Sequence, residues 1–119
     1  MVSEITRDEL KQKLDHPRRF TLIEVLPPQD YSRAHLPGAI NIPAAQLRGQ
    51  AAEQLPNKDM EMIVYGAGPD CPESKEAAAE LSEMGYINVR RYVGGKADWI
   101  SAGFPIASDY EQRTVKPAV

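Results

Sequence analysis

The sequence predicts an α/β fold with a mostly parallel β-sheet. Short apolar runs of strand length alternate with segments of helical periodicity, which is typical of a parallel sheet covered by helices. The chain has 119 residues, which suits one domain with one hydrophobic core. We therefore expect a single domain over residues 1–108, followed by a polar tail over 109–119.

The first helix is predicted by signals at both of its ends. Thr6 and Glu9 have the T-x-x-E spacing of a capping box, in which each side chain bonds a backbone N–H of the other residue. Ile5 and Leu10 have the spacing of a hydrophobic staple. Pro17 ends the helical pattern, because the residue before a proline is disfavoured in a helix.

Strands and helices are then expected to alternate to residue 108. Residues 20–25, "FTLIEV", are apolar except for one acid, as in a buried parallel strand. Leu47, Ala51 and Leu55 recur at helical spacing, and Gly85 ends a second strongly helical segment. The other expected elements, in order, are a turn or short helix over 29–38, a strand over 39–43, a helix over 47–55, a strand over 60–66, a helix over 74–85, a strand over 87–93, a helix over 96–103 and an extended segment over 104–108.

Composition and charge narrow the possible partners. The net charge of −3 gives no basic stripe for nucleic acid. One cysteine cannot form an intramolecular disulfide, which fits a reducing compartment. The N-terminus lacks the apolar core of a signal peptide, and no apolar run approaches the about 20 residues that span a bilayer. We expect a cytoplasmic protein that binds neither nucleic acid nor membrane.

The sequence does not match the motifs of a cysteine phosphatase, a dinucleotide-binding site or a metal site. A cysteine phosphatase needs C-x5-R, and Ala77 stands where that arginine would be. The segment "GAGPDC" has only the first two glycines of a dinucleotide-binding fingerprint. Two histidines and one cysteine, scattered along the chain, make no metal site. No cofactor and no metal are expected.

Two long segments resemble the signatures of the rhodanese-like domain family. "LIEVLPPQDYSRAHLPGAINIP" is similar to the first signature and "VGGKADWISAGFPI" to the C-terminal one. The resemblance covers residues 5–107. It implies a central parallel sheet of about five strands with helices on both faces. Within these segments we expect structural roles for Glu24, as a hydrogen-bonding acid, His35, as a tie for the turn, and Trp99, as a core residue.

The same resemblance identifies a candidate active-site loop. Enzymes of the family carry a cysteine directly after the preceding strand, and this cysteine takes sulfur from a donor as a persulfide. Here that position holds Gly66, and Cys71 stands five residues on, as the second cysteine of some relatives does. Cys71 is therefore a displaced candidate nucleophile. The candidate loop consists of Gly66, Ala67, Gly68, Pro69, Asp70, Cys71, Pro72, Glu73 and Ser74.

The sequence leaves the role of Cys71 open. Sulfur transfer needs a thiolate, and a helix N-terminus favours an anion, with Ser74 as a further hydrogen-bond donor. Asp70 and Glu73 oppose the anion, and their D-x-x-E spacing could itself cap the helix. The loop also lacks the arginine usual in the family.

The cations that neighbouring segments could supply to the loop are Arg90, Arg91 and Lys96. Two functions remain. One is a sulfurtransferase or persulfide carrier, with a sulfur donor and a thiophilic acceptor. The other is a catalytically silent module that binds or regulates a protein partner. Whether the protein is an enzyme stays open.

Overall fold

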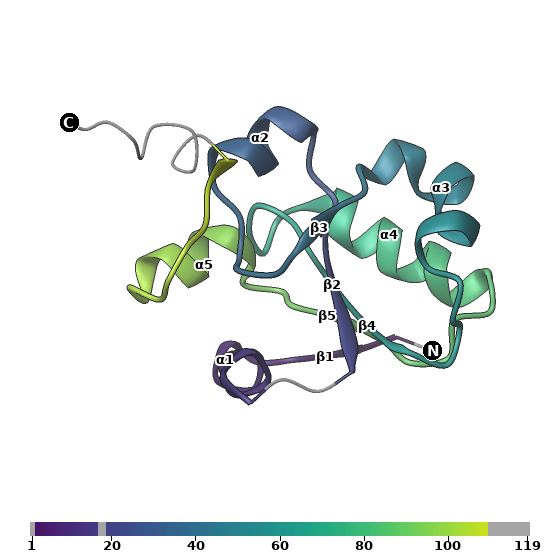
Figure 1. Cartoon of the computed structure of the whole chain (residues 1–119), viewed down its shortest axis with the longest axis horizontal. Helices are drawn as coiled ribbons and strands as arrows, with labels where there is room; N and C mark the ends of the chain where they lie inside the picture. Colours follow the sequence, from purple (N-terminus) through teal and green to yellow (C-terminus); the bar gives the residue numbers. More distant parts are fainter. Residues whose placement is uncertain (1, 17–18, 110–119) are drawn as a thin grey trace.

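Five parallel strands form one sheet in the order β1-β5-β4-β2-β3 in the computed structural model, which describes residues 2–16 and 19–109 (Figure 1). The strands are β1 (Val2–Glu4), β2 (Phe20–Glu24), β3 (Ile40–Asn41), β4 (Glu61–Tyr65) and β5 (Val89–Arg91). Every pairing is parallel. The prediction of an α/β fold with a parallel sheet of about five strands is confirmed.

Helices cover both faces of this sheet, as expected. They are α1 (Arg7–Asp15), α2 (Pro28–Arg33), the short 3-10 helix η1 (Ala44–Gln46), α3 (Leu47–Gln54), α4 (Pro72–Glu83) and α5 (Gly95–Ser101). Alternate residues of β4 point to opposite faces. Val64 packs in one core cluster with residues of α3 and α4, while Ile63 packs in a second cluster with Leu10 of α1 and Trp99 of α5. None of the helices in the described residues is long and apolar enough to span a bilayer.

The ends of α1 agree with the capping and proline signals in the sequence, whereas the start of α4 differs from the expected one. The capping box of Thr6 and Glu9 is present, and α1 ends at Asp15 with His16 as its C-cap. Helix α4 begins at Pro72, two residues before the expected start at Ser74. Proline is favoured at the first helical position because its missing N–H needs no partner there.

Strand β1 differs from the sequence-based expectation, the segment 104–108 is extended as expected, and most of the predicted tail lies outside the described residues. Strand β1 was not predicted, because Val2–Glu4 is a three-residue edge strand with all of its side chains exposed and therefore shows no alternation. The extended segment 104–108 pairs through Ala107 with His35 in an antiparallel bridge. Of the predicted polar tail, residues 110–119 lie outside the described part of the chain.

Candidate functional site

The candidate loop connects the carboxyl end of β4 to the first turn of α4. Strand β4 lies between β2 and β5, inside the sheet, and Gly66 follows its last residue directly. In parallel sheets covered by helices, ligands bind beyond the carboxyl ends of the strands. The fold therefore places the loop where such folds position chemistry.

Cys71 reaches back over the start of this loop. It is the N-cap residue of α4, and the residue is 7% exposed. A Cβ atom built on Gly66 would overlap Cys71 Sγ and would lie 3.2 Å from Cys71 Cβ. The sulfur thus occupies the space in which a side chain at position 66 would begin. Gly66 leaves room for a thiol that comes from five residues further along the chain.

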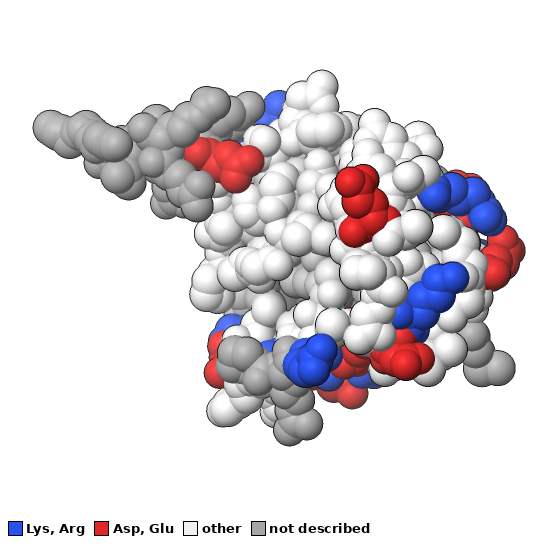
Figure 2. Space-filling view, turned by 45° about the vertical axis from the view of Figure 1, so that its right-hand side comes forward, with Lys and Arg blue, Asp and Glu red and all other residues white. Residues whose placement is uncertain are grey.

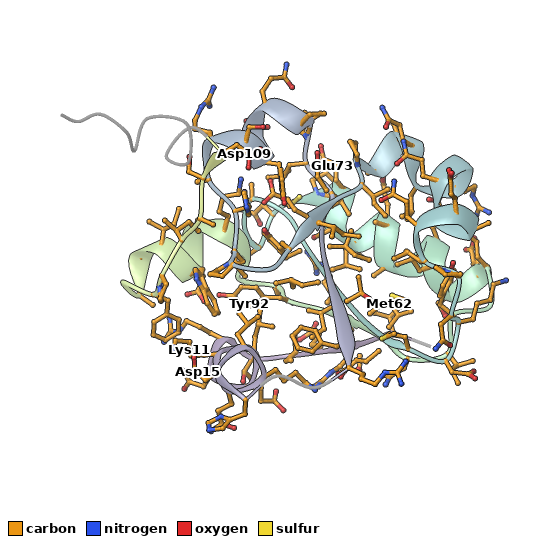
Figure 3. All side chains as sticks on the ribbon, in the orientation of Figure 1. Lys11, Asp15, Met62, Glu73, Tyr92 and Asp109 are labelled. Atoms are coloured by element: carbon orange, nitrogen blue, oxygen red, sulfur yellow. The ribbon has the colours of Figure 1, made fainter. Side chains whose placement is uncertain are left out.

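Two carboxylates were expected beside this thiol, and the structure gives them different roles. Cys71 Sγ donates a 3.3 Å hydrogen bond to Glu73 Oε1. Asp70 does not cap α4: the N-cap is Cys71, and the helix start has no side-chain capping bond. Figure 3 shows Glu73 at the N-terminal end of α4, on the side of the molecule where α2 lies. The cysteine is therefore a thiol in contact with one carboxylate.

Arg91 is the cation that reaches the loop. Its Nε donates to Ser74 Oγ at 3.0 Å, and its Nη2 donates to the carbonyls of Pro69 and Cys71 at 3.4 and 3.5 Å. The hydroxyl of Ser74 donates in turn to the Cys71 carbonyl at 3.2 Å. Ser74 therefore holds the loop backbone, and its proton is not aimed at the sulfur.

Arg90, the neighbour of Arg91, serves another part of the molecule. Its guanidinium pairs with Glu61 at 3.4 Å and with Glu9 at 3.6 Å. Successive residues of a strand point to opposite faces of a sheet, so the two arginines serve different helices. The sequence alone could not distinguish them.

The first turn of helix α5 is hydrogen-bonded to the loop through backbone groups. Lys96 N donates to the Gly66 carbonyl, and Ala97 N donates to the Ala67 carbonyl, each at 2.9 Å. Gly95 has a φ of +67°, and a Cβ there would lie within 2.7 Å of the backbone of Gly68. The second glycine of the C-terminal signature thus allows two backbones to touch.

Lys96, whose backbone N–H bonds the loop, also forms a buried ion pair with Glu24 through its side chain. Glu24 is fully buried at the end of β2, where Lys96 Nζ approaches its Oε2 at 2.9 Å and the Tyr65 hydroxyl donates to its Oε1 at 2.7 Å. The Leu36 N–H donates to the same tyrosine oxygen. Burial, and then the adjacent Glu24 carboxylate, raises the pKa of Tyr65 far above its usual range, so the phenol stays neutral and donates. Glu24 thus has the hydrogen-bonding contacts of the structural role that was expected for it, with Tyr65 and Lys96 as partners.

Two adjoining cavities open onto the loop. One, of about 450 Å³, is lined by residues 67–73 and by Leu26. The other, of about 440 Å³, is mostly apolar and shares Leu26 and Ala67 with the first. On the face shown in Figure 2, charged side chains lie mainly along the right-hand and lower margins and form no continuous basic stripe.

His35 and Trp99 have structural contacts away from the loop. His35 is stacked on Tyr31 with 3.9 Å between ring centroids, and its Nδ1 lies 2.7 Å from the Tyr31 carbonyl. The indole of Trp99 is buried and donates to the Pro105 carbonyl at 2.7 Å. In the described residues, no group of three His, Cys, Asp or Glu side chains is placed to hold a metal ion.

A family model, curated relatives and solved structures all relate this chain to rhodanese-like proteins. The sequence pattern of the family described as Rhodanese-like domain matches residues 6–102. The chain is 39% identical over 77 residues to thiosulfate sulfurtransferase PspE of Escherichia coli, covering 64% of this chain and 70% of that protein. It is 34% identical over 102 residues to an HTH-type transcriptional regulator of Mycobacterium tuberculosis, covering 86% of this chain and 43% of the regulator.

The solved structures agree with these sequence matches. The rhodanese-like domain of an Anabaena sp. protein superposes with a TM-score of 0.82 at 29% identity, covering 100% of this chain and 89% of that domain. The chain spans about half the length of the first two curated relatives that it matches.

Proposed function

Since the chain belongs to the rhodanese-like domain family, we propose that it accepts and passes on sulfur through a persulfide on Cys71. Curated relatives that carry the name sulfurtransferase support the reaction class. The sulfur donor and the thiophilic acceptor belong to the proposal, as do the action of residues 1–108 as one domain and a cytoplasmic, reducing location that keeps Cys71 a thiol.

One observation carries this proposal. Cys71 Sγ lies in the space above Gly66, directly beyond the carboxyl end of β4. In the family resemblance, a cysteine at position 66 would project its side chain into this space. The displaced cysteine therefore brings its sulfur to the same place by a different route.

The reaction would proceed in two displacements at this sulfur. The Cys71 thiolate attacks the outer sulfur of the donor, a new S–S bond forms, and the old bond breaks with its electron pair on the leaving group. A nucleophilic acceptor then attacks the outer sulfur of the persulfide and releases the Cys71 thiolate. The chain carries one sulfur atom between the two steps and needs no redox partner.

The start of α4 offers backbone donors for the sulfur anion. The first N–H groups of a helix have no intrahelical acceptors, and the helix dipole favours negative charge there. Pro72 has no N–H, so the donors closest in sequence belong to Glu73 and Ser74. No side-chain cap competes for them.

Mass spectrometry after incubation with a sulfur donor tests the proposal. With thiosulfate or with a low-molecular-weight persulfide, we expect the intact protein to gain the mass of one sulfur atom, located on Cys71 by peptide mapping. The Cys71→Ser variant should gain none, and transfer of the label to cyanide or a thiol should regenerate the original mass. Absence of the adduct with every donor would contradict the proposal.

The alternative, a silent module that binds or regulates a protein partner, is favoured by a separate observation. The Cys71 thiol is nearly buried and donates to the carboxylate of Glu73, which is a resting arrangement and not an activated one. In this case neither donor would label the protein, and Cys71→Ser would leave partner binding unchanged.

A further inference from the structure

The carboxylate of Glu73 touches the atom that would carry sulfur. Glu73 Oε1 accepts the hydrogen bond of Cys71 Sγ at 3.3 Å, although Glu73 is exposed and has free access to water. A thiol donates only while it keeps its proton. The negative charge of a carboxylate in this position repels an anion that approaches the sulfur. Glu73 is therefore placed to act on the charge of an incoming donor.

The charged residues that line the cavity of Cys71 are both acidic. Asp70 lines the same cavity from the loop and adds a second negative charge. Arg91 approaches from β5, but its hydrogen bonds run to Ser74 Oγ and to two backbone carbonyls. Lys96 of α5 is paired with buried Glu24. An anion that enters the cavity thus meets two carboxylates on its walls, and none of the residues that line this cavity is a cation.

We propose that Glu73 determines which donors the site accepts. It disfavours dianionic donors such as thiosulfate and leaves the site to organic persulfides of the type R–S–SH. This inference rests on the proposed function, because it names the donor class of the same site. It also separates the chain from its relative PspE, whose name specifies thiosulfate.

The charge balance of the two possible reactions explains the choice. With R–S–SH, the Cys71 sulfur bonds the outer sulfur, the donor S–S bond breaks, and the inner sulfur leaves with the electron pair and takes up the thiol proton. The products are the Cys71 persulfide and R–SH, and no net charge develops. With thiosulfate, the Cys71 sulfur bonds the outer sulfur, the donor S–S bond breaks, and sulfite leaves with the electron pair. The two negative charges of this donor must then enter and leave the site beside Asp70 and Glu73, where the local field is unfavourable.

Alkylation of Cys71 by two reagents that differ in charge tests this inference without any sulfur transfer. Iodoacetate is an anion and iodoacetamide is neutral, so the ratio of their rates reports the field at the sulfur. In Glu73→Gln, which keeps an oxygen acceptor but removes the charge, we expect the ratio of iodoacetate to iodoacetamide rates to rise about threefold, allowing for solvent screening of an exposed group. Glu76→Gln removes an exposed charge from the same helix and should leave the ratio unchanged.

The donors themselves supply the second measurement. We expect wild-type protein to form the Cys71 persulfide faster with cysteine persulfide than with thiosulfate, and Glu73→Gln to reduce this preference by accelerating the thiosulfate reaction. An unchanged alkylation ratio in Glu73→Gln, or an equal rise in Glu76→Gln, would overturn the inference. A changed ratio without a persulfide from any donor would refute the proposed function and leave the charge effect of Glu73 established.

Discussion

Two helices begin beside strand β5, and their first turns are built differently. At α1, the side chains of Thr6 and Glu9 bond the free backbone N–H groups, with Thr6 N to Glu9 Oε1 at 3.0 Å and Glu9 N to Thr6 Oγ1 at 3.1 Å. At α4, Cys71 is the N-cap and makes no capping bond. At a capped helix start, side chains of the protein accept hydrogen bonds from the first backbone N–H groups. At an uncapped start, these N–H groups are available to a ligand.

The neighbouring arginines of β5 follow the same division. Arg90 pairs with Glu9 at the start of α1, and Arg91 bonds the loop that leads into α4. Both helix starts have a glutamate three residues after a residue that can cap a helix, in the patterns T-x-x-E and D-x-x-E. Pro72 decides the difference, because it occupies the first helical position and makes Cys71, not Asp70, the cap. A capping-box spacing is therefore insufficient evidence of a cap.

The largest expected effect comes from closing the space at the start of α4. In Gly66→Ala the new Cβ overlaps Cys71 Sγ, so the thiol must move or the loop must shift. We expect a loss of about 1–3 kcal/mol in the free energy of unfolding, together with loss of persulfide formation. Urea denaturation measures the first and mass spectrometry the second.

Two controls make this result specific. Gly49→Ala in α3, where a Cβ has nothing within 4 Å, should stabilise the protein by up to about 1 kcal/mol. In Gly66→Ala combined with Cys71→Ala, most of the lost stability should return, since the overlapping atom is gone. Additive losses in the double variant would show that the two positions do not share this space.

Next in size is the removal of the arginine at the uncapped start. Arg91→Gln loses hydrogen bonds to Ser74 and to two carbonyls, and we expect a cost of about 1–2 kcal/mol in stability. The iodoacetamide reactivity of Cys71 should also change, because the loop backbone is released. Arg90→Gln, which removes half-buried ion pairs with Glu9 of α1 and Glu61 of β4, should cost a similar amount but leave Cys71 reactivity as it was. Equal changes in reactivity would contradict the division of roles.

Breaking the capped start should have a smaller, purely structural effect. Thr6→Ala removes the side-chain acceptor for Glu9 N, and we expect a loss of about 1 kcal/mol in the free energy of unfolding. Persulfide formation and Cys71 alkylation should match wild type. A change in either rate would show that the two helix starts are coupled.

The smallest effect is the pH dependence of the capped start. Hydrogen bonding to the Thr6 backbone N–H, with help from Arg90, lowers the pKa of Glu9 from its usual value of 4.5. A lowered folded-state pKa means that this stability is present above the usual value and is lost as pH falls through the lowered one. The stability difference between wild type and Glu9→Gln should therefore shrink on acidification. Urea denaturation of the two proteins at neutral and at acidic pH measures this difference.

Local signals in the sequence predicted most of the fold. The α1 helix was predictable because Thr6, Glu9 and Pro17 act on their immediate neighbours. Strand β1 was not, because the exposed residues Val2–Glu4 become a strand only through pairing with β5, which lies more than 80 residues away.

The site was predictable in position but not in arrangement. The family resemblance placed the loop, and Cys71 followed as its candidate. The overlap of its sulfur with the space above Gly66 depends on how the loop folds back, and the contacts of Arg91 and Lys96 cross between elements that are distant in sequence. Only the early start of α4 had an overlooked signal, the proline that follows Cys71.

Trp99 gives this protein a built-in optical reporter. It is the only tryptophan in the sequence, its ring is buried against Tyr92 and Phe104, and it lies on the helix whose first turn holds the carbonyls of the loop. The tryptophan fluorescence of the unlabelled protein therefore originates from one indole within that helix. Movement of α5 that accompanies loading or discharge of sulfur would change its emission, so stopped-flow fluorescence can follow the cycle in real time without a dye.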